Sequence, residues 1–216
     1  IDLPIAHGEG SKLHETEDMF RLLAPLKIYG PIPPLTVTAD ATLAQQLQTQ
    51  LPANLAQSSG PLVALHISAR KEKQRWPVEN FVELAQRLHA QHAARFLVFW
   101  SPGDENNPFH PGDDGKAAQL LATLADLPVA PLRTEHLSEL IAGLSLCDAA
   151  VLSDGGGMHV AAGLGKPLVC FFGNSSAERW HPWGVPYELL QKPSRDVSEI
   201  SVAESVDAFG RLMSRR

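Results

Sequence analysis

The chain has 216 residues, a hydrophobic fraction of 44%, a charged fraction of 19% and a formal net charge of -6. These values are typical of a soluble folded protein and exclude intrinsic disorder, and the negative charge leaves no basic footprint for nucleic acid. The length predicts one domain with a short appendage. The longest apolar stretches, such as 96–100 and 168–172, are far shorter than the roughly 20 residues that span a bilayer, so no transmembrane helix is expected.

Cysteine usage and the first residues bear on the compartment. Cys147 and Cys170 lie in apolar stretches without C-x-x-C spacing, which indicates two reduced core thiols in a cytoplasmic protein. Residues 1–10 lack the charged start and apolar run of a signal peptide. Because the chain begins with Ile1, we expect it to be part of a longer product.

The first quarter of the chain differs from the rest. Apolar spacing predicts a short helix over 14–24, which ends where Pro25 would deny it a backbone donor. A proline-rich connector follows, and a second helix is predicted over 40–51, with an aspartate as its cap. Because 52–61 is rich in Ala, Ser and Pro, it is predicted to be a linker. Residues 1–61 are therefore interpreted as an N-terminal appendage, a link to or remnant of another domain.

Residues 62–216 alternate apolar runs of strand length with helical periods, which is typical of a parallel sheet covered by helices. The strand runs are continuous, as expected for strands that are buried on both faces. The six predicted strands are 62–67, 95–100, 127–130, 149–153, 167–172 and 187–190. The predicted helices are 78–92, 116–124, 137–146, an Ala-rich segment after Gly157, and 201–213, which opens with a capping box. The predicted fold class is α/β, with helices on both faces of the sheet.

The most informative strand end carries a glycine-rich turn, called the glycine turn below. It reads Asp154-Gly155-Gly156-Gly157-Met158-His159. Several glycines between a strand and a helix let the backbone approach an anion closely, whereas a plain tight turn would need only one. An anion site is therefore favoured, although the pattern matches neither a P-loop nor the dinucleotide fingerprint.

A second candidate is the basic loop, residues 68–75, which follows the first strand. It carries four cations, Arg70, Lys71, Lys73 and Arg75. These could neutralise a diphosphate, with Ser68 as a hydroxyl donor, or they could form a solvated charged loop. The two alternatives weigh about equally.

Three weaker patterns remain. Asp104 and Glu105 follow the second strand, where carboxylates of a nucleotide-binding fold can accept hydrogen bonds from ribose. Asp113 and Asp114 with His110 could suggest a metal site, but the neighbouring Gly and Pro favour a polar loop, and no metal is expected. The segment 173–177 is similar to a hydrolase nucleophile elbow, but the chain order of acid and histidine argues against a triad.

Taken together, these motifs resemble glycosyltransferase family 9, the lipopolysaccharide heptosyltransferases. The resemblance is carried, in chain order, by Arg75-Trp76-Pro77, Leu137-Ser138-Glu139-Leu140, the glycine turn with Ala161-Ala162-Gly163-Leu164-Gly165-Lys166-Pro167, and Phe172-Gly173. It covers residues 62–216, with 14–26 similar to the segment before the second domain. One departure is Gly155, where family members often have a hydroxyl residue.

The resemblance implies a GT-B architecture of two facing Rossmann-like domains, with 62–216 as the C-terminal nucleotide-sugar-binding domain. The implied donor-binding residues are Asp154, Gly155, Gly156, Gly157, Met158 and His159 for diphosphate and sugar, Ser68 and Arg70 with Lys73 or Arg75 for phosphate, Asp104 or Glu105 for ribose, and Leu132 and Thr134 along the base. The departing diphosphate gains charge as its bond to the sugar breaks, and helix-end N–H groups and cations would stabilise that charge.

By the same resemblance, the enzyme transfers heptose or a related sugar with inversion, from a nucleotide sugar such as ADP-heptose to a lipopolysaccharide-type acceptor, without cofactor or metal. The general base is expected outside this chain, which would transfer sugar poorly alone. A lipid-linked acceptor would bring the enzyme to the inner face of the inner membrane. The alternative is a non-catalytic module that binds a nucleotide or a nucleotide sugar.

Overall fold

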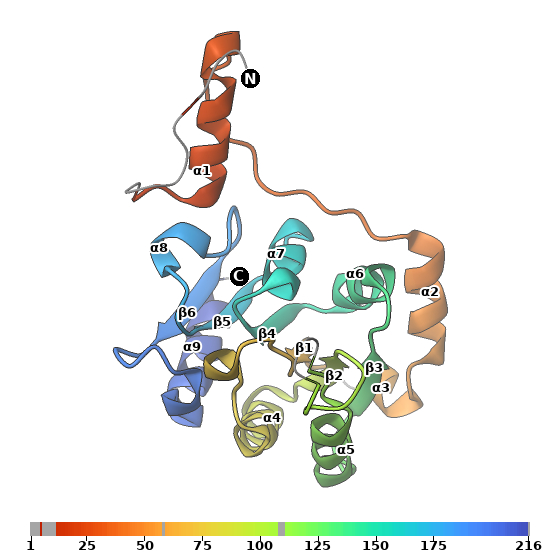
Figure 1. Cartoon of the computed structure of the whole chain (residues 1–216). Coiled ribbons are helices and arrows are strands. Elements are labelled where there is room, and N and C mark those ends of the chain that lie inside the picture. The colour runs from red at the N-terminus through yellow and green to blue at the C-terminus, as the bar shows by residue number, and fades with distance from the viewer. Residues whose placement is uncertain (1–4, 6–11, 58, 108–110, 216) are drawn as a thin grey trace.

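The computed structural model describes residues 5, 12–57, 59–107 and 111–215 (Figure 1). In these residues six parallel strands form one sheet in the order β3-β2-β1-β4-β5-β6. The strands are β1 (Leu62–His66), β2 (Arg95–Trp100), β3 (Val129–Arg133), β4 (Ala149–Ser153), β5 (Leu168–Phe172) and β6 (Tyr187–Gln191). This is the order of the doubly wound dinucleotide-binding fold, so the predicted fold class is confirmed.

Helices cover both faces of the sheet. The longer ones are α2 (Ala41–Gln50), α4 (Val78–His92), α5 (Asp114–Thr123), α6 (Leu137–Leu146), α7 (Gly156–Gly163) and α9 (Val202–Ser214). The short ones are α1 (Glu15–Phe20), η1 (Arg21–Leu26), α3 (Ala53–Gln57), η2 (Glu72–Gln74), α8 (Ala177–Trp180) and η3 (Val197–Glu199). Figure 1 shows α4, α5 and α9 on one face, and α6 and α7 on the other with α2 at their side.

Strand β1 shows how the core is divided. Val63 and Leu65 pack into the cluster under α4 and α9, whereas Leu62 and Ala64 pack into the cluster under α6 and α7. All four side chains are buried, because successive residues of a central strand point to opposite faces. The continuous apolar strands of the sequence therefore reflect a sheet with two cores.

Several predicted boundaries differ from the structure, and three of the differences have a clear cause. The first helix does not end before Pro25, because the chain continues as the 3₁₀-helix η1 with that proline inside it. The predicted linker contains α3, whose Leu55 is fully buried and whose backbone carbonyl accepts a hydrogen bond from Arg95. Strand β3 begins two residues later than predicted, because Leu127 still donates its N–H to the end of α5.

The N-terminal elements contact the sheet domain. Helix α2 packs on α6, and side chains of the α1 segment contact α8 and the loop after it. His14, only 4% exposed, lies with its Nε2 2.8 Å from the carbonyl oxygen of His181, and the buried Asp18 pairs with Arg179 at 3.2 Å. The division of the chain at residue 61 stays a prediction.

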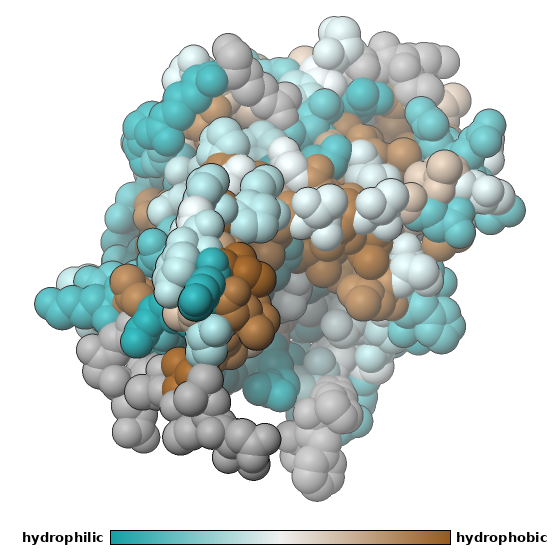
Figure 2. Space-filling view, turned by 90° about the horizontal axis from the view of Figure 1, so that it is seen from above, coloured by the Kyte–Doolittle hydropathy of each residue, from teal (hydrophilic) through white to brown (hydrophobic). Residues whose placement is uncertain are grey.

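The surface seen from above in Figure 2 mixes hydrophilic and apolar residues. In the N-terminal elements, the large exposed hydrophobic side chains are Met19, Leu26, Ile28 and Tyr29. Within the described ranges, no helix has both the length and the apolar character required to cross a bilayer.

Candidate functional site

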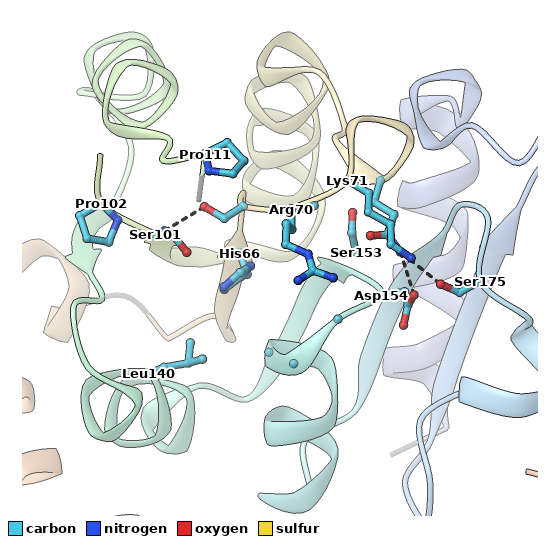
Figure 3. A pocket seen from close by; sticks show the side chains of 16 residues that line it. His66, Arg70, Lys71, Ser101, Pro102, Pro111, Leu140, Ser153, Asp154 and Ser175 are labelled. Atoms are coloured by element: carbon cyan, nitrogen blue, oxygen red, sulfur yellow. Dashed lines mark hydrogen bonds between the residues drawn. The ribbon is translucent and has the colours of Figure 1, made fainter. Parts of the chain in front are cut away.

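A hollow of about 500 Å³ lies at the carboxyl ends of β1, β2 and β4. The strand order changes direction between β1 and β4, and ligands of open α/β sheets bind outside such a point. The hollow is lined by His66, Ser68, Ala69, Arg70, Lys71, Gln74, Ser101, Pro102, Pro111, Leu140, Ser153, Asp154, Gly155, Gly156, Gly157 and Ser175 (Figure 3). Its volume falls in the range of small-molecule sites.

The glycine turn forms one wall. Gly155 has φ +155° and ψ -172°, a conformation essentially restricted to glycine, and its carbonyl accepts the N–H of Met158. Helix α7 begins at Gly156, so the first N–H groups of the helix lack intrahelical partners beside the hollow. A Cβ on Gly156 would meet no atom within 4 Å, which leaves that backbone open to a ligand. The turn therefore presents the N–H groups of a helix N-terminus to the hollow, an arrangement that suits an anion.

The basic loop forms the opposite wall, but only two of its four cations line the hollow. Arg70 and Lys71 do so from exposed positions, and Figure 3 shows Arg70 between His66 and Asp154. Lys73 does not line the hollow, and its charge lowers the pKa of Asp196 as a minor contribution behind hydrogen bonds from Ser198.

The fourth cation, Arg75, is turned inward. Its Nε donates to the carbonyl oxygen of Ala69 at 2.9 Å, and its Nη2 lies 4.0 Å from Oδ1 of Asp113. Neither Lys73 nor Arg75, between which the sequence left the phosphate contact open, lines the hollow, whereas Arg70 and Lys71 do.

Side-chain hydrogen bonds anchor both ends of the basic loop. Trp76 is 1% exposed, and its Nε1 donates to the carbonyl oxygen of Ile200 at 2.8 Å. Lys116 of α5 donates from Nζ to the carbonyl oxygens of Ile67 at 2.9 Å and Trp76 at 2.8 Å, so it joins the two ends. At the start of the loop, Ser68 accepts a hydrogen bond from the Ser101 N–H.

The predicted site residues that line the hollow are Ser68, Arg70, Asp154, Gly155, Gly156 and Gly157. Two others on α7 do not. Met158 is fully buried in the core, and His159 lies edge-on to Trp180 with ring centroids 6.1 Å apart. Burial lowers the pKa of His159, and the nearby charge of Asp154 partly opposes this.

The residues predicted for ribose and base lie elsewhere. Asp104 and Glu105 line a separate hollow of about 400 Å³, where the Asp104 carboxylate accepts two hydrogen bonds from Asn106. Leu132 is buried in β3, and the Thr134 hydroxyl donates to the carbonyl of Trp100. These four residues do not line the main hollow.

Sequence reasoning missed His66 and Gln74, which both line the hollow. The position of His66 at the end of β1 was a usable signal. Burial lowers the pKa of its imidazole against the opposing charge of Asp113, so the ring is neutral near pH 7. Nothing in the sequence pattern marked Gln74.

The described residues contain no group of three or more His, Cys, Asp or Glu side chains arranged to hold a metal ion. His110, considered with the aspartate pair, lies outside the described residues.

The sheet order and the hollow at the switch point define a doubly wound, Rossmann-like α/β domain. Residues 10–205 match the sequence model of glycosyltransferase family 9 (heptosyltransferase). The chain belongs to this family, and the predicted resemblance is confirmed.

Individual proteins that the chain is similar to carry names from the same family. The chain is 30% identical over 108 residues to lipooligosaccharide heptosyltransferase 2 of Haemophilus influenzae, an alignment that covers 50% of this chain and 30% of the relative. A family 9 glycosyl transferase from Veillonella parvula matches with TM-score 0.78 at 16% identity, over 98% of this chain and 63% of that one. E. coli heptosyltransferase WaaC, solved with ADP, matches with TM-score 0.67 at 21% identity, over 95% of this chain and 58% of that one. The chain thus spans less than two thirds of each of these proteins.

Proposed function

We propose that this chain binds a nucleoside-diphosphate sugar in the 500 Å³ hollow, as the donor-binding half of a glycosyltransferase. The transferred sugar is a heptose or a related sugar, and the acceptor is of the lipopolysaccharide type. Family membership supports the proposal. The observation that carries it is that the glycine turn and two cations of the basic loop line the same hollow.

The chemistry of the lining fits a departing diphosphate. Negative charge grows on the bridging oxygen as the bond to the sugar breaks. The N–H groups at the start of α7 favour that charge through their own dipoles and through the helix dipole. Arg70 and Lys71 add positive charge from the opposite wall, so the lining residues can stabilise the leaving group without a metal or a cofactor.

The proposal assigns the acceptor-activating base to a part of the enzyme outside this chain. An inverting transfer needs a general base at the acceptor hydroxyl, on the sugar face opposite the leaving group. We therefore expect little transfer by this chain alone. We place the enzyme in the cytoplasm, at the inner face of the inner membrane when a lipid-linked acceptor is bound.

Nucleotide binding is tested by thermal unfolding of the chain with ADP, UDP, GDP or inorganic phosphate. A ligand at about 100 times its Kd adds about 2.7 kcal/mol, which raises Tm by roughly 5 to 10 °C for this size. Lys71→Ala should reduce the shift, whereas Lys73→Ala, its matched control, should not. Both lysines are exposed in the same loop, but only Lys71 lines the hollow. Equal effects of the two variants, or no shift with any nucleotide, would contradict the proposed site.

Transfer is tested separately. ADP release from ADP-heptose is measured with a lipopolysaccharide-type acceptor, for this chain and for a chain that also carries an acceptor domain. We expect turnover only in the longer chain, and its loss in Asp154→Ala. Binding without turnover in either chain would indicate the alternative, a non-catalytic nucleotide-sugar module.

A further inference from the structure

A neutral amide joins the basic loop to the glycine turn. Gln74 is 6% exposed, and its Nε2 donates to Oδ2 of Asp154 at 2.9 Å and to Oγ of Ser175 at 3.3 Å (dashed lines in Figure 3). Asp154 follows β4 and Ser175 follows β5. Both hydrogens of the amide are thereby engaged, and the side chain connects three loops at one edge of the sheet.

The surroundings hold Gln74 in place. A Cβ on Gly173 would lie 2.6 Å from the carbonyl oxygen of Lys73 and 3.1 Å from Cγ of Gln74, so the basic loop packs directly on the end of β5. Gln191, the last residue of β6, donates to the carbonyl oxygens of Gly173 at 2.9 Å and Ser175 at 3.0 Å. The amide of Gln74 is therefore presented to Asp154 by packed backbone.

One wall of the hollow carries a carboxylate, that of Asp154, although the rest of the lining suits an anion. A carboxylate repels a diphosphate, but it accepts hydrogen bonds from hydroxyl groups, which a donor sugar carries in abundance. Gln74 engages Oδ2 and leaves Oδ1 available for a ligand. A hydrogen bond to one oxygen of a carboxylate also restricts its rotation, which lowers the entropy lost when the other oxygen binds.

We propose that Gln74 is a positioning residue, which orients Asp154 toward the sugar of the donor and so sets how much more tightly the site holds a nucleotide sugar than the bare nucleotide. This inference rests on the proposed function. It assigns to a neutral amide a specificity role that acts through Asp154 and not through direct contact with phosphate.

The first test compares Kd values for ADP and ADP-heptose by calorimetry, in the wild-type chain and in Gln74→Ala. Loss of one oriented, charge-assisted hydrogen bond should weaken ADP-heptose binding about tenfold or more, while ADP binding changes by less than about threefold. Ser175→Ala removes the second hydrogen bond of the amide but keeps the one to Asp154, so its effect on the ratio of the two Kd values should be smaller. Urea unfolding of each variant verifies that it folds.

The second test uses Gln74→Glu, which preserves shape but places a carboxylate against Asp154. Two carboxylates at hydrogen-bond distance share a proton once the pH is low enough, because their repulsion raises the pKa of the pair. The affinity of Gln74→Glu for ADP-heptose, divided by that of the wild type, should therefore rise as the pH is lowered from about 8 to about 5.5. His159 also senses the charge of Asp154, so both proteins carry His159→Gln in this experiment, which removes the imidazole titration from the ratio.

The outcomes separate this inference from the proposed function. A wild-type chain that binds neither ADP nor ADP-heptose overturns both. If the wild type binds both ligands, equal losses for ADP and ADP-heptose in Gln74→Ala, an equal effect of Ser175→Ala, or a pH-independent Gln74→Glu ratio would overturn the role of Gln74 alone. A selective loss of ADP-heptose affinity in Gln74→Ala, together with recovery of that affinity in Gln74→Glu at low pH, supports the role of Gln74.

Discussion

Lys116 connects the stability of the fold to the geometry of the basic loop. Its amino group donates to the carbonyl oxygens of Ile67 and Trp76, which flank the loop, yet the side chain lies in a largely desolvated position. Burial lowers the pKa of this amine from 10.5 to about 8, although the negative charge of Asp113 opposes the shift. Arg75 lowers the pKa further, and Glu79 raises it.

The sign of the pH dependence follows from this lowered pKa. Below about pH 8 the lysine is charged in both folded and unfolded chains, and the full cost of burying the charge is present. Between about pH 8 and 10.5 the unfolded chain binds more protons than the folded one, so the free energy of unfolding rises with pH. From about pH 7.5 to about pH 9.5 the gain attributable to this one group is about 2 kcal/mol.

The assay is urea unfolding of the wild type and of Lys116→Met at these two pH values. The variant also loses two hydrogen bonds, but that loss is the same at both pH values and cancels in the comparison. The wild type should therefore gain about 2 kcal/mol relative to the variant on raising the pH. Lys71→Met, on the exposed part of the same loop, is the matched control. If the free energy of unfolding differed between wild type and Lys116→Met by the same amount at both pH values, the lowered pKa of the buried lysine would be refuted.

Three further predictions concern the same framework. Gly155→Ala should destabilise the fold by about 1 to 3 kcal/mol in urea unfolding, from backbone strain alone, because no atom lies within 4 Å of the added Cβ; a neutral change would disprove the strain. Trp76→Phe should cost about 1 to 3 kcal/mol, because the buried carbonyl of Ile200 loses its donor; an unchanged midpoint would show that the bond contributes nothing. Cys147 and Cys170 are buried, and burial raises the pKa of both thiols, so a thiol reagent should label them only in denaturant; rapid labelling of the native chain would contradict this burial.

Much of the fold follows from local pattern. The predicted bounds of β2, β4, α4 and α6 are those of the structure, because each is a long apolar run or a helix with a clear period. The failures have one local and one tertiary cause. Pro25 fits inside a 3₁₀-helix, and the 52–61 segment is helical in part because Leu55 finds a buried place that only the folded sheet creates.

The candidate site, like the fold, could be predicted from the sequence only in part. The sequence alone determined where it lies, since the carboxyl ends of parallel strands meet at one edge and both the glycine turn and the basic loop follow strands. Tertiary structure decided which side chains face the hollow. Lys71 does and Lys73 does not, because the conformation of an irregular loop depends on contacts from distant elements. No sequence pattern pointed to Gln74, because the role proposed for its amide depends on the carboxylate of Asp154. Only folding brings that carboxylate within 2.9 Å of the amide.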